Sequence, residues 1–168
     1  MFHKSILAAG FLAITACTVP IGTTKSTFHE TAKPVAAGNI AVRARNAAFV
    51  QTAEAKFNAL RAAQGLGPVR FDETLAKSAE VHARDMAING FRSHAGSDGS
   101  NFVARAKRVG ASCAKGENLA WGFRQSDGAF DWWLNSPPHR ANLMQGSIAK
   151  FGLAEVNRIW VLVTGRNC

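Results

Sequence analysis

The stretch Phe151-Gly152-Leu153-Ala154-Glu155-Val156-Asn157-Arg158-Ile159-Trp160-Val161-Leu162-Val163-Thr164 decides the fold of this chain. Residues 151–156 alternate between larger and smaller side chains, which is the period of a β-strand. Asn157-Arg158 fits a two-residue turn. Residues 159–164 form a continuous β-branched and aromatic run, which suits a central strand buried on both faces. The stretch therefore predicts an antiparallel hairpin.

A two-stranded hairpin alone is only marginally stable in water, so the fold requires a third strand. We expect it in the segment around Asn118 to Phe123. The residues before this segment have helical spacing instead. Helices followed by a hairpin predict the α+β class, as an α-β-α sandwich of about four helices packed on a small antiparallel sheet.

The four expected helices are marked by apolar stripes, caps and breakers. The first runs from about Asn39 and ends at Gly65-Leu66-Gly67-Pro68; the second is capped by Asp72 and ends at Asn89-Gly90; the third spans about Phe102 to Val109 and closes at Gly110; the fourth is capped by Ser126 and is terminated by Pro137-Pro138.

The N-terminal residues predict an export signal rather than part of the domain. The apolar run Ile6–Ala16 is too short to span a bilayer as a mature helix and is typical of a signal peptide. Ile14-Thr15-Ala16-Cys17 resembles a bacterial lipoprotein cleavage box, with lipid on Cys17. The alternative is an ordinary signal peptide, with Cys17 a bystander. We expect a leader over 1–16, a flexible tether over 17–38 and one domain over 39–168.

Charge and cysteine content narrow the partners. With Cys17 lipidated, Cys113 and Cys168 remain, and an oxidising compartment favours a disulfide between them over two free thiols. The formal net charge is +9, which suits a membrane surface or an anionic envelope ligand, including lipids. It is also what a solvated surface with no partner would have. Nucleic acid does not fit an exported protein, and we expect a monomer.

Three polar residues stand in distinctive contexts. They are His94 in Gly90-Phe91-Arg92-Ser93-His94, Glu117 in Gly116-Glu117-Asn118-Leu119-Ala120-Trp121, and His139 in Trp133-Leu134-Asn135-Ser136-Pro137-Pro138-His139-Arg140-Ala141-Asn142. Two imidazoles and a carboxylate are suited to a metal ion or to general acid–base work.

With further matching pieces upstream, these motifs resemble the CAP superfamily, which comprises cysteine-rich secretory proteins, antigen 5 and pathogenesis-related 1 proteins and their bacterial relatives. The upstream pieces are Asn58-Ala59-Leu60-Arg61, Pro68-Val69-Arg70-Phe71-Asp72, Leu75-Ala76 and Val81-His82-Ala83-Arg84-Asp85-Met86. The resemblance covers about Val42 to Thr164. It implies an α-β-α sandwich with a shallow cleft lined by a His-Glu-Glu-His set.

Only three members of that set transfer to this chain: His94, Glu117 and His139. The second glutamate of the animal and plant members falls at Ser136, which weakens a mechanism that needs two carboxylates. Asp131 lies on the same predicted helix, but its spacing places it on another face.

Each of these residues also has a structural interpretation. His94 can anchor its loop, Glu117 can brace backbone amides, and His139 can pack on the proline turn. Asn118 is interpreted as a brace for the cleft wall, and His82 as a hydrogen-bonded core histidine. The tryptophans of this region (Trp121, Trp132, Trp133) are interpreted as core and rim rather than as a binding platform.

Two functions remain open at this point. The first is a lipid-anchored, extracytoplasmic module at the cell envelope that binds a ligand or partner, on the outer membrane if the host is diderm. The second is a metal-dependent hydrolase of peptide or envelope polymer, with Zn²⁺ held by His94 and His139 and with Glu117 as base or third ligand. The resemblance suggests lipids as one ligand class. The absence of a nucleophile motif leaves enzymatic activity undecided.

Overall fold

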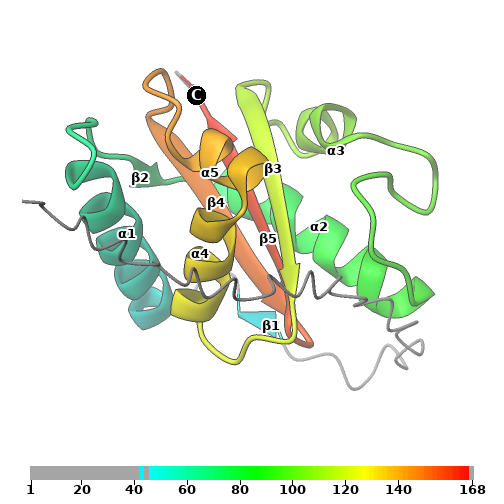
Figure 1. Cartoon of the computed structure of the whole chain (residues 1–168). Helices are drawn as coiled ribbons and strands as arrows, with labels where there is room; N and C mark the ends of the chain where they lie inside the picture. The colour runs from blue at the N-terminus through cyan, green and yellow to red at the C-terminus, as the bar shows by residue number, and fades with distance from the viewer. Residues whose placement is uncertain (1–41, 44–45, 167–168) are drawn as a thin grey trace, which may run out of the picture. The chain divides into compact units, whose positions relative to one another are not determined.

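The computed structural model describes residues 42–43 and 46–166 of the 168-residue chain. Within this part it contains five helices and one five-stranded sheet (Figure 1). In chain order the elements are β1 (Val42–Arg43), α1 (Ala47–Ala62), β2 (Arg70–Phe71), α2 (Glu73–Asn89), α3 (Phe102–Arg108), β3 (Ala114–Trp121), α4 (Ser126–Asn135), α5 (Pro137–Leu143), β4 (Lys150–Val156) and β5 (Ile159–Gly165).

The predicted hairpin forms the centre of the sheet. β4 and β5 pair antiparallel, with Val156 opposite Ile159. The turn residues Asn157 and Arg158 both have positive φ angles, of 50° and 60°. Both central residues of a type I′ turn have positive φ, and such a turn matches the twist of the flanking strands. The expected α+β sandwich is confirmed, and Asn157-Arg158 makes its central connection.

The sheet is mixed rather than purely antiparallel, which corrects the prediction. Its strand order is β1-β4-β5-β3, and β2 pairs with β4 in parallel. The third long strand runs from Ala114 to Trp121, whereas we expected it around Asn118 to Phe123. The difference arises because Gly122, at φ +89°, turns the chain away before Phe123.

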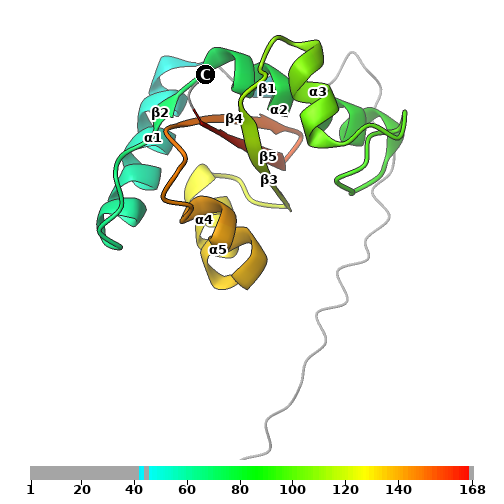
Figure 2. The same cartoon turned by 90° about the horizontal axis from the view of Figure 1, so that it is seen from above.

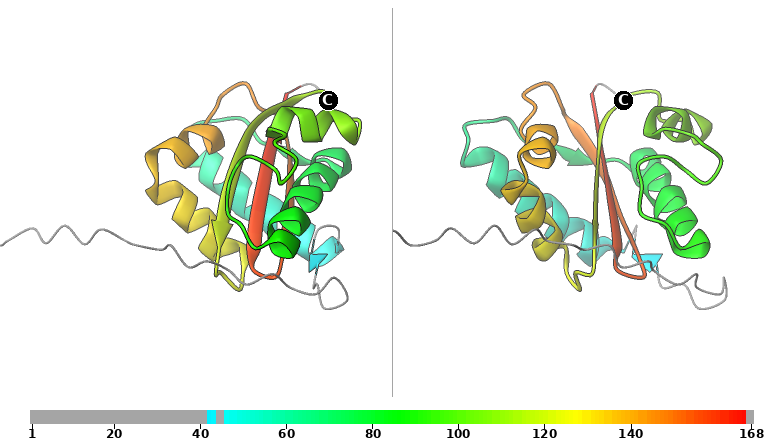
Figure 3. Two further views of the ribbon diagram at one scale, coloured as in Figure 1. Left: turned by 90° about the vertical axis from the view of Figure 1, so that its right-hand side faces the viewer. Right: turned by 45° about the vertical axis from the view of Figure 1, so that its right-hand side comes forward.

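Helices cover both faces of the sheet, as Figures 2 and 3 show. Side chains of β5 alternate between the two cores: Val161 packs with α2 and α3, and Trp160 and Leu162 pack with α1, α4 and α5. α2 lies so close to β4 that a Cβ on Gly152 would come within 2.0 Å of the Ala76 amide nitrogen. The predicted burial of the last strand on both faces is therefore confirmed.

Three helix boundaries differ from the prediction. Val42 belongs to β1, so the first helix starts only at Ala47, where the Asn46 side chain caps it. The N-cap of α4 is Gln125 rather than Ser126, and no side-chain hydrogen bond caps this helix. Pro137-Pro138 does follow the end of α4, but the same two residues begin α5. Proline is tolerated in the first turn of a helix because no helical N–H is lost there.

The leader, the tether and Cys17 fall on residues outside those described, so these remain predictions. Cys168 also lies outside them. Among the residues the structure does describe, no helix is long and apolar enough to cross a membrane.

Candidate functional site

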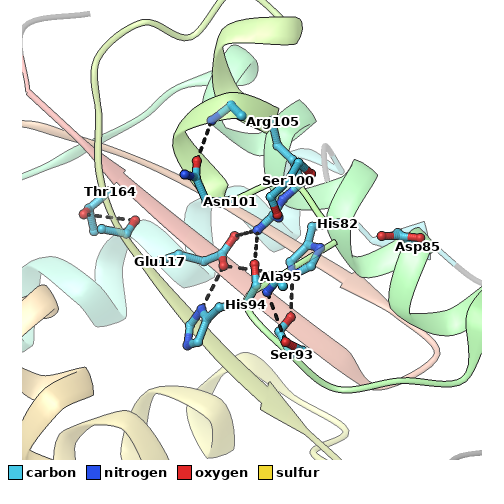
Figure 4. Close-up of polar contacts among 12 residues, drawn as sticks. His82, Asp85, Ser93, His94, Ala95, Ser100, Asn101, Arg105, Glu117 and Thr164 are labelled. Carbon is cyan, nitrogen blue, oxygen red and sulfur yellow. Dashed lines mark hydrogen bonds and ion pairs between the residues drawn. The ribbon is translucent and has the colours of Figure 1, made fainter. Parts of the chain in front are cut away.

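Glu117 is the centre of a buried polar network on the face of β3 that packs against α2 and α3. The exposed fraction of its side chain is 2%. One carboxylate oxygen accepts from Arg105 Nη2 at 2.7 Å, and the other lies 2.8 Å from His94 Nδ1. Figure 4 shows both partners converging on this carboxylate. Because a buried charge is tolerated only when it is paired and hydrogen-bonded, Arg105 is what makes a buried Glu117 possible.

Arg105 also fixes the loop that carries His94. Its guanidinium donates to the carbonyl of Ser100 at 2.6 Å and to the carbonyl of His94 at 3.0 Å. The side chain is 3% exposed. A planar guanidinium can bridge several acceptors at once, so one residue of α3 holds the loop and Glu117 together.

The contact with Glu117 decides how His94 faces the solvent. A carboxylate only accepts hydrogen bonds, so Nδ1 of His94 carries the proton in this contact. The other ring nitrogen, Nε2, takes no part in this contact. It belongs to a side chain that is 58% exposed. Glu117 thus fixes the orientation of the His94 ring and leaves its Nε2 available to a ligand.

His82 supports the same loop from the core. It is fully buried, and its Nε2 donates to the carbonyl of Ser93 at 2.8 Å. Burial lowers the pKa of His82, and the nearby Glu117 carboxylate, 4.0 Å away, opposes this shift only in part. His82 is therefore a neutral core histidine, which agrees with the interpretation of its place on the apolar stripe.

His139 belongs to a second group on the opposite side of β3. Its Nδ1 lies 2.9 Å from Ser136 Oγ, and its carbonyl accepts from Asn118 Nδ2 at 3.0 Å. Burial lowers the pKa of His139, and a positive charge on the His94 ring would lower it further. His139 is therefore neutral at physiological pH. Ser136, at the position of the missing glutamate, orients this ring.

Asn142 couples the two groups across β3. Its amide donates to the carbonyl of Glu117 at 3.2 Å and to Asn118 Oδ1 at 2.9 Å. Asn118 thus connects Asn142 to the main chain of His139. The predicted residues form two linked pairs, His94 with Glu117 and His139 with Ser136, joined through Asn118 and Asn142.

An open cleft of about 370 Å³ lies beside His94 and Glu117. Its other lining residues are Ala95, Gly99, Ser100, Asn101, Phe102, Lys115, Gly116 and Asn142. Lys115 is exposed, and the charge of the one lining carboxylate, Glu117, is balanced by Arg105. The cleft therefore presents more positive than negative charge to a ligand.

Glu117 is poorly placed as a third zinc ligand, because its side chain is 2% exposed and its charge is already paired with Arg105. Two histidines remain, whereas catalytic zinc is usually held by three protein ligands. Within the described ranges, no group of three or more His, Cys, Asp or Glu side chains could hold a metal ion.

Sequence reasoning missed Arg105, Asn142 and Lys115. Arg105 and Lys115 stand outside every motif used above. The one available signal for Arg105 was a basic residue at the centre of a short apolar stripe, where a charge must find a partner.

Fold and site together define a class of protein: a three-layer α-β-α domain in which a histidine–carboxylate pair beside an edge strand lines an open cleft. The sequence model of one protein family, described as "CAP: Cysteine-rich secretory protein family", matches residues 54–157 of this chain. The chain belongs to this family, as its motifs predicted.

Two relatives in Bacillus subtilis (strain 168) are similar in sequence. The uncharacterized protein YkwD is 33% identical over 106 residues, covering 61% of this chain and 41% of YkwD. The uncharacterized membrane protein YlbC is 28% identical over 97 residues, covering 57% of this chain and 28% of YlbC. The chain thus spans less than half the length of each relative.

Solved structures share the fold. An extracellular protein containing a SCP domain from Bacillus anthracis str. Ames has a TM-score of 0.68 at 25% identity, covering 71% of this chain and 41% of that one. An outer surface protein from Borrelia burgdorferi has a TM-score of 0.65 at 22% identity, covering 75% of this chain and 98% of that one.

Proposed function

We propose that this chain is an extracytoplasmic binding module, held to the membrane by lipid on Cys17, whose cleft beside His94 takes an anionic ligand of the cell envelope. The observation that carries this proposal is the state of Glu117. Its carboxylate is buried and paired with Arg105, so it adds little negative charge to the cleft. The exposed His94 and Lys115 remain to meet a ligand.

Several features support the location. The apolar run before Cys17 is typical of an export signal. The family is one of secretory proteins, and the two solved neighbours above are an extracellular and an outer surface protein. A disulfide between Cys113 and Cys168 belongs to the same proposal. Arg166 N donates to the carbonyl of Cys113 at 3.1 Å. Arg166 precedes Cys168 by two residues in the sequence.

The ligand proposal can be tested by NMR titration of the chain carrying Cys17→Ser. The probes are inorganic phosphate and the short-chain lipid dihexanoyl phosphatidylglycerol. We expect the imidazole and amide signals of His94 and the amide of Lys115 to shift with at least one probe. Lys115→Ala should weaken the response several-fold. A response to the lipid alone would identify a headgroup with its glycerol; a response to both would identify the phosphate.

Lys107→Ala is the matched control, because Lys107 is an exposed lysine that does not line the cleft. It removes the same charge and should leave the titration unchanged. If Lys107→Ala and Lys115→Ala have equal effects, binding is non-specific and the cleft is not the site.

The metal-dependent hydrolase remains the competing function. It is favoured by one observation: internal hydrogen bonds engage Nδ1 of both His94 and His139. Histidines that bind zinc through one ring nitrogen commonly donate the N–H of the other to such a partner, which orients the ring. Zinc titration by calorimetry would decide between the two functions. Heat that disappears in both His94→Ala and His139→Ala would contradict our assignment of the cleft to an anionic ligand.

For the anchor, we expect Cys17→Ser to release the protein from the membrane fraction of cells. Unchanged fractionation would contradict the lipid on Cys17 without affecting the cleft.

A further inference from the structure

Phe102 is an aromatic side chain of the cleft that takes no part in either core. It is half-buried and lines the cleft together with His94. Among the described residues, the partly buried apolar side chains packed on the two cores include Phe91 and Val109 but not Phe102. The ring of Phe102 is therefore available to the apolar face of a ligand.

A β-bulge lies at the residue that supplies the positive charge of the cleft, Lys115. In the register of β3 with β5, Ala114 lies opposite Gly165 and Gly116 lies opposite Thr164, so Lys115 is the extra residue. Bulges redirect a side chain and are over-represented next to active sites. Lys115 is exposed, and no carboxylate in the described ranges forms an ion pair with it. Its ammonium group is therefore free to meet an anion.

Two asparagines offer the cleft hydrogen bonds of opposite kinds. Asn101 caps α3 through its Oδ1, which accepts from Ala104 N at 2.9 Å, so its Nδ2 remains as a donor. The Oδ1 of Asn142 accepts one long hydrogen bond, from Gln145 at 3.4 Å, and keeps a second lone pair. This oxygen lies over Gly116, where a Cβ would come within 3.0 Å of it. The wall of the cleft thus provides both a donor and an acceptor.

The lining of the cleft suits a polar ring better than an acyl chain. Apart from Phe102, the one apolar side chain larger than a hydrogen atom on its wall is Ala95; the other lining residues are glycine or polar. An acyl chain gains free energy only where apolar surface is removed from water, and this open cleft covers little. A sugar ring has an apolar C–H face and a rim of hydroxyl groups that both donate and accept, so each part has a partner here.

We propose that the anionic ligand of the cleft is a sugar residue that carries a carboxylate, as part of an envelope glycan. The C–H face of the ring packs on Phe102, and the side-chain amides of Asn101 and Asn142 bond its hydroxyl groups. The carboxylate pairs with Lys115 in a charge-assisted hydrogen bond. This inference rests on the proposed function, which assigns an anionic ligand to the cleft, and it adds the ring that carries the charge.

NMR titration of the full chain carrying Cys17→Ser tests this with three matched probes. Methyl β-glucuronide has the ring and the carboxylate, methyl β-glucoside has the ring alone, and acetate has the carboxylate alone. We expect the glucuronide to shift the ring signals of Phe102 and the amide of Lys115, and to bind several-fold more tightly than either other probe. An affinity equal to that of acetate would overturn the role of the ring. An affinity equal to that of the glucoside would overturn the role of the carboxylate.

Two variants separate the sugar from the anion. Phe102→Leu keeps an apolar side chain without an aromatic face, and Asn101→Ser keeps an oxygen that can cap α3 without the Nδ2 donor. Each should weaken glucuronide binding several-fold and leave the response to inorganic phosphate unchanged, whereas Lys115→Ala should weaken both.

Trp132→Leu is the matched control, because Trp132 is an aromatic side chain of α4 that is 46% exposed and does not line the cleft. It should change neither response. No loss of glucuronide binding in Phe102→Leu, or an equal loss in Trp132→Leu, would overturn the proposal.

Failure of the sugar and failure of the anion site give different results. A phosphate response at Lys115 without any preference for the glucuronide over acetate would overturn the sugar and leave the anionic ligand of the proposed function standing. No response to any of the anions would overturn both.

Discussion

Arg105 is the side chain on which the geometry of the cleft depends most. It bonds Glu117 and the carbonyls of Ser100 and His94 from a buried position. Removing one partner of a buried ion pair costs about 3–5 kcal/mol, because the other charge is left uncompensated. We expect Arg105→Gln to lower the free energy of unfolding by that order in urea denaturation. It should also change the tautomer signature of His94 in ¹⁵N NMR.

Arg108→Gln provides the comparison for Arg105. Arg108 also lies on α3 and also pairs with an acid, Asp98, but both side chains are exposed. An exposed pair contributes about 0–1 kcal/mol, so this variant should lose little stability and leave His94 unchanged. Equal losses in the two variants would mean that burial of the Arg105–Glu117 pair is not what stabilises the site.

His82 predicts a stability that depends on pH. Burial lowers its pKa below the ordinary value near 6.5, so below that value the unfolded chain binds more protons than the folded one. The free energy of unfolding should therefore fall as pH decreases from about 6.5 toward the lowered pKa, by at most about 1.4 kcal/mol per pH unit for this group. Above 6.5 its contribution is fully present.

His82→Gln should flatten this dependence, since glutamine keeps a donor for the Ser93 carbonyl and does not titrate. The measurement is urea denaturation at a series of pH values from 5 to 8. His139 contributes a slope of the same sign, so some dependence should survive. An unchanged slope in the variant would show that His82 is not the group that takes up the proton.

Among the elements, the contact of α2 with β4 allows one sharp prediction. A Cβ on Gly152 would lie 2.0 Å from the Ala76 amide nitrogen and 2.2 Å from the Leu75 carbonyl carbon. Backbone atoms cannot move aside without shifting α2, and overpacking of a core commonly costs about 1–3 kcal/mol or more. We expect Gly152→Ala to lower the melting temperature by many degrees. Gly146→Ala, where no atom lies within 4 Å, should change it little.

The elements with strong local patterns were the predictable ones. The β4–β5 hairpin follows from alternation and from a turn pair, and α2 follows from a capping Asp72 and a closing Gly90, whose φ is +69°. β1 and β2 have two residues each, too few for any periodicity. Their strand state comes from pairing with β4, which is a tertiary effect. α5 was missed because Pro137-Pro138 was interpreted only as a stop signal.

The candidate site was predictable only in part, for a related reason. Motif context named His94, Glu117 and His139, and placed Ser136 at the position of the missing glutamate. It did not show that His94 and His139 bond to different partners. That division arises because Glu117 and Asn118 are neighbours in a strand and so point to opposite faces of the sheet. Arg105 comes from another helix, and only the folded chain brings it to Glu117.

The proposed disulfide between Cys113 and Cys168 bears on the stability of the whole molecule. The main chain of Arg166 bonds the carbonyl of Cys113 beside the start of β3, and Cys168 follows two residues later. If these cysteines are joined as proposed, the bond closes a loop that contains β3, β4 and β5. Removing a native disulfide typically costs about 2–5 kcal/mol, chiefly because the unfolded chain regains freedom. Cys168→Ser should therefore destabilise the protein by about that amount in thermal unfolding without reductant.

Cys113→Ser should have an effect similar to that of Cys168→Ser, and the double variant should add little, because either change alone opens the same loop. Mass spectrometry of peptides from the unreduced protein should find Cys113 joined to Cys168. A peptide that joins Cys113 to Cys17 would contradict both the disulfide and the lipid anchor, since an acylated Cys17 has no thiol to share. One measurement thus tests two proposals that depend on how three cysteines are divided between membrane attachment and fold stability.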